Sequence, residues 1–315
     1  MKIAALSCSY NRKKTTSRFL QSVVNQELPA GVRMDVYLLD DNSPDGTGEY
    51  VSENFPTVRL ERGSGALFWA GGMRTLWKRV LARENYDLFL LLNDDVVLDA
   101  GAVKQLVEAR SLSAYPENII MGTVLDSSAR YITYGGLKLT NKITGNAAFL
   151  KPDDTKLKPC EIGNANIMLV DKATVEKIGI LSELYTHGIA DYDYTLKGIK
   201  NGVKVWVGPG YYGYCDNDHM MTWLPHGTPL KKRIEYLYSP KGLGYKQFMH
   251  YTRGHFPLSV PIIFVKLWLK TLFPLVYDKY KKNQLNVETN SDFIFPEPTT
   301  QVAEEKLPKN NELVH

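Results

Sequence analysis

Short apolar runs alternate with helix signals along the first hundred residues, and this alternation limits the fold more than any other feature. The runs lie at residues 3–8, 36–39 and 88–92, and the last one contains no polar residue. Strands that helices cover on both faces of a parallel sheet read as unbroken apolar runs. The pattern therefore predicts an α/β fold with a mostly parallel sheet flanked by helices.

Capping residues and glycines set the expected helix boundaries. Thr15 and Thr16 are suitable N-caps for a first helix that carries the apolar residues between Phe19 and Val24. The glycine-rich stretch at 63–72 predicts a loop, and a helix from Met73 to Arg83 is expected after it.

Acidic clusters follow the apolar runs and are the main candidates for chemistry. Asp40-Asp41 and Asn93-Asp94-Asp95 come directly after predicted strands, and Asp191-Tyr192-Asp193 opens a predicted helix. Open parallel sheets bind ligands at the carboxyl ends of their strands, where the first two clusters are expected. Hard oxygen ligands in the second cluster suit Mg²⁺ or Mn²⁺. A carboxylate of the third cluster could accept a proton.

Each cluster also has a purely structural explanation. Acids and Asn at 40–42 can cap a turn, and polar residues at 93–95 can mark a strand leaving the core. Acids at the start of a helix favour its dipole. Local sequence alone does not choose between these explanations and the chemical ones.

Motifs and composition disfavour several classes of protein. In the G-x-G-x-x-G fingerprint that Gly63 and Gly65 could begin, the third glycine position holds Phe68. No G-x-x-x-x-G-K-[ST] motif occurs, so a nicotinamide dehydrogenase and a P-loop kinase are disfavoured. The three cysteines predict no disulfide framework and favour a reducing compartment. No basic module with interleaved aromatic residues indicates nucleic acid.

Positive charge is concentrated near the C-terminus. Residues 1–230 carry 25 Lys and Arg against 26 Asp and Glu, whereas residues 231–282 carry 11 against 2. Pro261 can open a helix there, with a broad apolar surface between Ile262 and Phe273 and with Lys266 and Lys270 together on the other face. Such a helix suits an anionic membrane surface. Packing on the rest of the chain, or a homodimer contact, is the alternative.

In their order along the chain, these segments resemble glycosyltransferase family 2, whose members have the Rossmann-like GT-A fold. Ile3-Ala-Ala-Leu-Ser-Cys-Ser-Tyr-Asn-Arg12 resembles the family's first strand and nucleotide loop. Residues 38–47 resemble its pyrimidine-reading motif, and residues 91–96 its metal motif. Residues 179–194 resemble the segment with the catalytic base. The resemblance covers roughly residues 2–220 and implies an inverting sugar transfer.

The resemblance implies a role for individual residues. Asp191 would be the catalytic base, and Asp41, with Asp40 as the alternative, would read the base of the donor. The donor-binding residues would be Ser9, Asn11, Arg12, Asp41, Asn42, Gly71 and Asp94. The metal ligands would be Asp95, Asn93 and His219, with Cys215 and Asp216 as alternatives to the histidine. Asn93 departs from the family pattern, which has an acidic residue there.

The resulting hypothesis is a glycosyltransferase that uses Mn²⁺ or Mg²⁺ and a UDP- or dTDP-sugar. The acceptor is expected to be a hydroxyl of a surface glycan, lipid-linked, at the cytoplasmic face of the plasma membrane. Expected parts are a catalytic domain at 1–228, a basic helical appendage at 229–282 and a disordered tail at 283–315. Within the domain, a nucleotide-sugar half spans about residues 1–100, and an acceptor half about 101–228.

Two other functions stay open from the sequence. A sugar nucleotidyltransferase on a similar sheet would need an early basic loop that binds a triphosphate, for which Arg12 and the lysines next to it are candidates. A membrane-associated scaffold without activity would bind no nucleotide.

Overall fold

The structure is a computed structural model that describes residues 1–216 and 223–279. Its helices are α1 (Lys13–Val24), α2 (Thr47–Asn54), α3 (Phe68–Arg83), α4 (Ala102–Ser111), α5 (Lys172–Ile178), α6 (Ala190–Lys200), α7 (Leu230–Tyr238), α8 (Tyr245–His255), the 3-10 helix η1 (Pro257–Ser259) and α9 (Val260–Leu272). Its strands are β1 (Lys2–Ser9), β2 (Arg33–Asp40), β3 (Arg59–Arg62), β4 (Leu88–Leu92), β5 (Val97–Leu98), β6 (Asn118–Met121), β7 (Val124–Leu125), β8 (Ile132–Tyr134), β9 (Gly136–Asn141), β10 (Asn146–Phe149), β11 (Lys158–Pro159), β12 (Ile162–Gly163), β13 (Ile167–Asp171), β14 (Lys204–Val207) and β15 (Gly213–Tyr214).

One large sheet organises the fold. Its eight strands run in the order β11-β14-β6-β13-β4-β1-β2-β3. The strands β3, β2, β1 and β4 are parallel to one another, whereas β13 is antiparallel to both β4 and β6. The described residues also form two smaller sheets, with the strand orders β10-β9-β12 and β5-β15-β7-β8. The predicted α/β fold with a mostly parallel sheet is confirmed.

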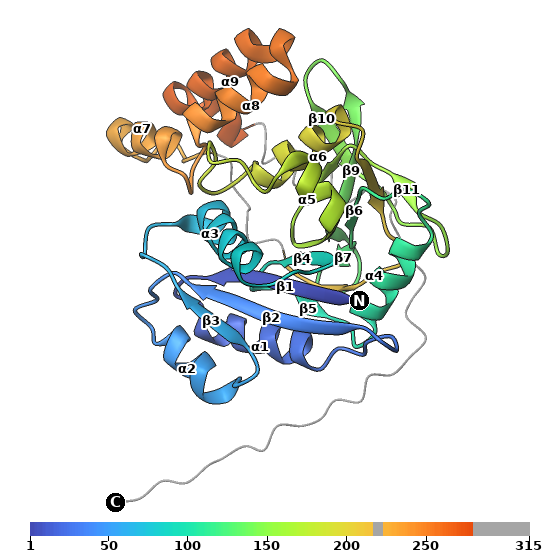
Figure 1. The fold of residues 1–315 in the computed structure, drawn as a ribbon. Coiled ribbons are helices and arrows are strands. Elements are labelled where there is room, and N and C mark those ends of the chain that lie inside the picture. Colours follow the sequence, from blue (N-terminus) through green and yellow to red (C-terminus); the bar gives the residue numbers. More distant parts are fainter. Residues whose placement is uncertain (217–222, 280–315) are drawn as a thin grey trace, which may run out of the picture.

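Helices cover both faces of this sheet, as Figure 1 shows for α1 and α2 on one face of β1–β3 and α3 on the other. Alternate residues of one strand therefore enter different cores. In β4, Leu90 packs with residues of α1 and α4, whereas Leu91 packs with residues of α3 and α6. This two-sided burial explains why the run at 88–92 has no polar residue.

Two helices begin earlier than the sequence predicts. The first starts at Lys13, so Thr16 is a helical residue and not an N-cap. The third starts at Phe68 and takes in Gly71 and Gly72, where we expected a loop. The backbone N–H groups of Ala70 and Gly71 donate to Thr186 O, which satisfies early amides of α3. A contact far along the chain thus extends the helix through residues that favour a turn.

The three C-terminal helices gather on the α3 and α6 side of the molecule (Figure 1). They share a small core of their own that includes Leu237, Met249 and Leu267. His255 Nε2 lies 2.8 Å from Asp193 Oδ1, which ties α8 to α6. The expected tail at 283–315 lies outside the described residues. Of the helices that the structure describes, none has the length and apolar character needed to cross a membrane.

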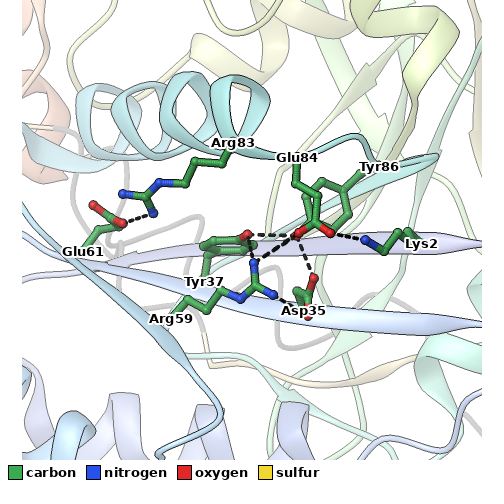
Figure 2. A network of polar contacts seen from close by, with 8 residues as sticks. All are labelled: Lys2, Asp35, Tyr37, Arg59, Glu61, Arg83, Glu84 and Tyr86. Carbon is green, nitrogen blue, oxygen red and sulfur yellow. Dashed lines mark hydrogen bonds and ion pairs between the residues drawn. The ribbon is translucent and has the colours of Figure 1, made fainter.

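A polar network lies at the amino ends of β1–β3, away from the acidic clusters. Figure 2 shows its members: Lys2, Asp35, Tyr37, Arg59, Glu61, Arg83, Glu84 and Tyr86. Tyr86 Oη donates to Asp35 at 2.7 Å and lies 2.8 Å from Tyr37 Oη. Arg59 pairs with Asp35 at 3.2 Å and with Glu84 at 3.3 Å. The network joins the first three strands to the end of α3, so this edge has a structural role.

Candidate active site

A cavity of about 450 Å³ opens at the carboxyl ends of β1, β2 and β4. Ligand sites of small molecules commonly have this size and position. Seven of the residues singled out in the sequence line it: Ser9, Arg12, Asp41, Asn93, Asp94, Asp95 and Asp191. The three acidic clusters therefore meet in one cavity although they are up to 150 residues apart in the chain.

The other predicted residues have different places. Asn11 and Asn42 do not line the cavity, but both have positive φ (56° and 58°) and shape the loops after β1 and β2. The Asn11 N–H donates to Ser43 Oγ at 2.8 Å, which joins these two loops. Gly71 lies inside α3 and outside the cavity lining. His219 lies outside the described residues.

The two acids after β2 have separate partners. Asp40 is fully buried and pairs with Arg62 at 2.7 Å, so its side chain holds the sheet edge. Asp41 lines the cavity, and its two oxygens accept the backbone N–H groups of Gly65 and Leu67, each at 2.8 Å. A carboxylate has about four lone-pair directions. Asp41 can therefore hold the glycine-rich loop and still accept a hydrogen bond from a ligand.

Arg12 joins the two acids after β4. Its Nη1 lies 3.1 Å from Asp94 Oδ1, and its Nη2 lies 3.0 Å from Asp95 Oδ2. Thr16 Oγ1 also donates to Asp94 at 3.4 Å, which gives this helical threonine a place in the site. Burial, and then the charge of Asp95, raise the pKa of Asp94 to about 6, although Arg12 opposes the shift. Asp94 is thus the acid of this pair that loses most solvation.

The cavity wall offers oxygen atoms for a divalent cation. Asn93 Oδ1 and Asn166 Oδ1 are buried without a hydrogen-bond partner in the described part of the chain, and both residues line the cavity. Amide and carboxylate oxygens are ligands that Mg²⁺ and Mn²⁺ accept. Asn93 and Asp95 therefore fit such an ion by their chemistry. Within residues 1–216 and 223–279, no group of three or more His, Cys, Asp or Glu side chains is arranged to hold a metal.

The alternatives to His219 have distinct positions. Cys215 Sγ lies 3.4 Å from Asp95 Oδ1 and accepts a hydrogen bond from Asn166 Nδ2 at 3.4 Å. Asp216 Oδ1 instead accepts the Ser127 N–H at 2.8 Å. Of these two, Cys215 is the one in contact with the acidic cluster.

Asp191 stands at the first turn of α6 with its carboxylate in the cavity wall. Oδ2 accepts the Ala165 N–H at 3.0 Å, and Oδ1 accepts the Tyr192 N–H at 2.9 Å. Burial raises the pKa of Asp191 to about 6, against these two hydrogen bonds. A carboxylate with this pKa is ionised at neutral pH and is a stronger base than an exposed aspartate.

Backbone strain is concentrated at the cavity. Ile189, which precedes α6, has φ of 65°, and Phe68 at the start of α3 has φ of 55°. Both residues line the cavity. A left-handed conformation is costly for a β-branched or bulky residue and often marks a functional site. Here it sets the directions in which α3 and α6 leave the cavity.

Trp69 and His187, which the sequence places in loops where a substrate could lie, also line the cavity. Several other lining residues carried no clear signal in the sequence: Cys8, Tyr10, Phe68, Tyr134, Asn164, Asn166, Gly188, Ile189, Tyr192 and Lys241. The Asn164-Ala165-Asn166 segment before the apolar run of β13 could have been noticed, since it repeats the pattern of polar residues at a strand end. Lys241 could not, because it reaches the cavity from the turn between α7 and α8. Its Nζ lies 5.8 Å from the centroid of the Tyr10 ring.

Comparison with known families gives one match. Residues 5–158 match the family model for glycosyl transferase family 2. This segment includes the loops after β1, β2 and β4 but ends before Asp191. No curated protein sequence matches the chain.

Solved structures with similar folds share little sequence with the chain. TarS 1-349 of S. aureus in complex with UDP is 14% identical at a TM-score of 0.50, over 70% of this chain and 61% of that one. The mannosyltransferase PcManGT of Pyrobaculum calidifontis, in complex with GDP-Man and Mn²⁺, is 13% identical at 0.50, over 92% and 76%. GalNAc-T7 with UDP, GalNAc and Mn²⁺ is 13% identical at 0.53, over 66% and 42%. The chain thus spans less than two thirds of the TarS structure, and these likenesses show the fold alone.

Proposed function

The chain belongs to glycosyltransferase family 2, and from this we propose that it moves a sugar from a UDP- or dTDP-sugar to a glycan hydroxyl, with inversion at the anomeric carbon. The observation that carries the proposal is the single cavity shared by Asp41, the Asn93–Asp95 cluster and Asp191. A base-reading carboxylate, a site for the diphosphate and a proton acceptor are what such a transfer needs.

Asp191 is the proposed general base. It accepts the proton of the acceptor hydroxyl while the hydroxyl oxygen forms a bond to the anomeric carbon. The bond from that carbon to the diphosphate oxygen breaks, and its electron pair leaves with the nucleoside diphosphate. The backbone N–H groups of Ala165 and Tyr192 orient the carboxylate for this step.

Asp95 and Asn93 are the proposed ligands of Mn²⁺ or Mg²⁺. A bound divalent cation supplies positive charge that stabilises the leaving diphosphate. The unpartnered, buried oxygen of Asn93 supports this assignment, because it lacks a hydrogen bond within the described chain. PcManGT and GalNAc-T7 are structures in complex with Mn²⁺, which agrees with the same proposal for this chain.

Asp41 is the proposed reader of a pyrimidine. Uracil and thymine carry an N3–H that a carboxylate can accept, whereas cytosine presents an acceptor there. A buried polar group that recognises one pattern rejects the other because its partner is left unpaired. TarS and GalNAc-T7 are structures with UDP, which supports testing uridine nucleotides first.

A thermal-shift panel of UDP-, dTDP-, CDP- and GDP-sugars with Mn²⁺ tests the donor assignment. A ligand that binds the folded state raises the unfolding temperature by mass action. We expect shifts from UDP- or dTDP-sugars and little from CDP-sugars, and Asp41→Asn should remove the difference. An equal response to CDP- and UDP-sugars, or a response to GDP-sugars alone, would contradict the role of Asp41.

The acceptor is proposed to be a lipid-linked surface glycan at the cytoplasmic face of the plasma membrane, reached through the C-terminal helices. Four apolar residues spaced three or four apart form one exposed stripe on α9: Ile262, Val265, Leu269 and Leu272. Their exposed fractions lie between 42% and 53%. Leu267 and Thr271, on the opposite face of α9, are buried.

Charge around the α9 stripe supports an anionic lipid surface over a second copy of the chain. Residues 230–279 carry 9 Lys and Arg against 2 Asp and Glu. Two copies joined through this surface would place like charges together, which opposes association. An apolar stripe with basic residues beside it instead matches the interface of a bilayer that contains anionic lipid.

Vesicle co-sedimentation tests the membrane proposal. We expect binding to vesicles with phosphatidylglycerol and much weaker binding to pure phosphatidylcholine. Val265→Gln with Leu269→Gln should lower the partition coefficient by about tenfold, because two apolar side chains no longer enter the lipid. Leu112→Gln, at an exposed residue that ends α4, is the matched control. Unchanged vesicle binding of the double variant would contradict the proposal. A wild-type protein that is a dimer, together with a double variant that is a monomer, would also contradict it.

A further inference from the structure

Arg12 lies where the chain's own charge and an incoming cation would compete. One guanidinium nitrogen contacts each carboxylate after β4, at 3.1 Å from Asp94 and 3.0 Å from Asp95. The side chains of Asp94 and Asp95 are 7% and 19% exposed, whereas that of Arg12 is 37% exposed. The carboxylates thus belong to the cavity wall, and the arginine approaches them from its open side.

A divalent cation that binds Asp95 would be attracted by the negative charge of this carboxylate, and Arg12 already neutralises that charge. If both contacted the same carboxylate, the guanidinium of Arg12 and the cation would repel each other, most strongly where solvent is partly excluded. The guanidinium is planar and matches two oxygens at once, and this geometry suits a diphosphate as well as two carboxylates. The diphosphate of a donor that enters the cavity would therefore offer Arg12 a second partner, with paired oxygens like those of the two carboxylates.

We propose that Arg12 is a displaceable counter-cation of the donor site. Without ligand it pairs with Asp94 and Asp95. When a divalent cation and a nucleotide sugar bind, it leaves Asp95 and pairs with the donor's diphosphate. This inference rests on the proposed function, because it requires a diphosphate and a divalent cation in the cavity. Arg12 is a donor-binding residue in this account, and it takes no part in proton transfer.

The proposal predicts effects of opposite sign for two ligands. Loss of Arg12 removes a competitor, so Mn²⁺ alone binds more tightly. The same loss removes a partner of the diphosphate, so UDP in the presence of Mn²⁺ binds more weakly. A residue with a merely structural role would weaken both or change neither.

Binding of Mn²⁺, followed by electron paramagnetic resonance of the free ion, tests the first effect in the full-length protein without nucleotide. We expect Arg12→Met to lower the Kd for Mn²⁺ by about tenfold. Lys14→Met removes the same charge from an exposed position on α1 and should change this Kd less than about twofold. Arg12→Lys should fall between wild type and Arg12→Met, because an ammonium cannot match two carboxylates in the same way.

Calorimetric titration of UDP at saturating Mn²⁺ tests the second effect, and we expect Arg12→Met to raise the Kd for UDP by about tenfold. Wild-type protein that binds UDP, together with an unchanged or higher Kd for Mn²⁺ in a folded Arg12→Met variant, overturns the counter-cation role and leaves the proposed transfer standing. An unchanged Kd for UDP in that variant also overturns it. Wild-type protein that binds no nucleotide, with or without Mn²⁺, overturns both proposals.

Discussion

Asp191 combines the features of a general base: a cavity position, two backbone hydrogen bonds that fix its carboxylate, and a pKa raised to about 6 by burial. The ionised form is the one that accepts a proton. We therefore expect kcat/KM to fall as pH drops through about 6 and to level off above pH 7. A pH–rate profile measures this directly, and a profile that is flat between pH 5 and 8 would contradict the role.

Replacement of the same carboxylate gives a second check at the residue scale. Asp191→Asn should lower kcat by about a thousandfold, because an amide cannot accept the proton. Glu183→Gln changes an exposed carboxylate outside the cavity and should leave kcat within about twofold. Equal unfolding temperatures would show that both variants are folded. Transfer at the wild-type rate by Asp191→Asn would mean that another group takes the proton.

The sequence indicates which residues are candidates for the site, but it does not indicate what surrounds each of them. Asp41, Asp94, Asp95 and Asp191 all line the cavity, and each follows a strand or opens a helix that the sequence pattern indicates. The Asp41 contacts to Gly65 and Leu67, in contrast, depend on a loop conformation that no periodic pattern encodes. The Arg12 bridge likewise joins residues 82 and 83 positions apart.

The glycine-rich loop before α3 leaves little room for an added side chain. A Cβ at Gly63 would lie 2.3 Å from Asp41 Oδ1 and 2.9 Å from Asp41 Cα. Because the backbone atom cannot move aside cheaply, Gly63→Ala should destabilise the protein by about 1–3 kcal/mol and weaken UDP binding. Chemical denaturation and calorimetry measure the two effects.

Gly101 provides the matched control for this element. A Cβ there meets nothing within 4 Å, and the residue precedes α4 with φ of −95°. Gly101→Ala should therefore change the free energy of unfolding by less than about 0.5 kcal/mol. If Gly63→Ala were as stable as Gly101→Ala and bound UDP normally, neither stability nor UDP binding would depend on the close packing of this loop on Asp41.

Element boundaries show where sequence reasoning reaches its limit. The strand at 88–92 is predicted residue by residue, since its burial on both faces leaves an unmistakable apolar run. The start of α3 is missed by five residues, because its early amides are satisfied by Thr186, which is more than 100 residues away. Local signals predict elements well and fail where a distant contact decides the end of one.

At the scale of the whole molecule, the C-terminal helices are joined to the site. Gln247 Nε2 donates to Thr186 Oγ1 at 2.8 Å, next to the cavity-lining residue His187. His255 pairs with Asp193, two residues after Asp191. Lys241 brings a positive charge into the cavity lining from the turn between α7 and α8. The appendage expected at 229–282 therefore contacts the proposed catalytic segment through Gln247 and His255 of α8.

Lys241 allows this connection to be tested. Lys241→Met should raise the KM for the nucleotide sugar by about fivefold, because a cation near the diphosphate is lost. Lys246→Met removes a charge from an exposed residue of α8 that does not line the cavity and should leave KM unchanged. Steady-state kinetics with both variants decide the matter: equal KM values would show that Lys241 lies too far from the donor to bind it.

The proposed function gives the three acidic clusters three separate tasks around one donor. A crystal structure with a UDP-sugar and Mn²⁺ tests it most directly. We predict uracil N3 within hydrogen-bond distance of Asp41, at about 2.6–3.2 Å, the diphosphate beside Arg12 and Asp95, and the Asp191 carboxylate facing the anomeric carbon. A uracil ring bound away from Asp41, or a sugar whose anomeric carbon points away from Asp191, would contradict the account.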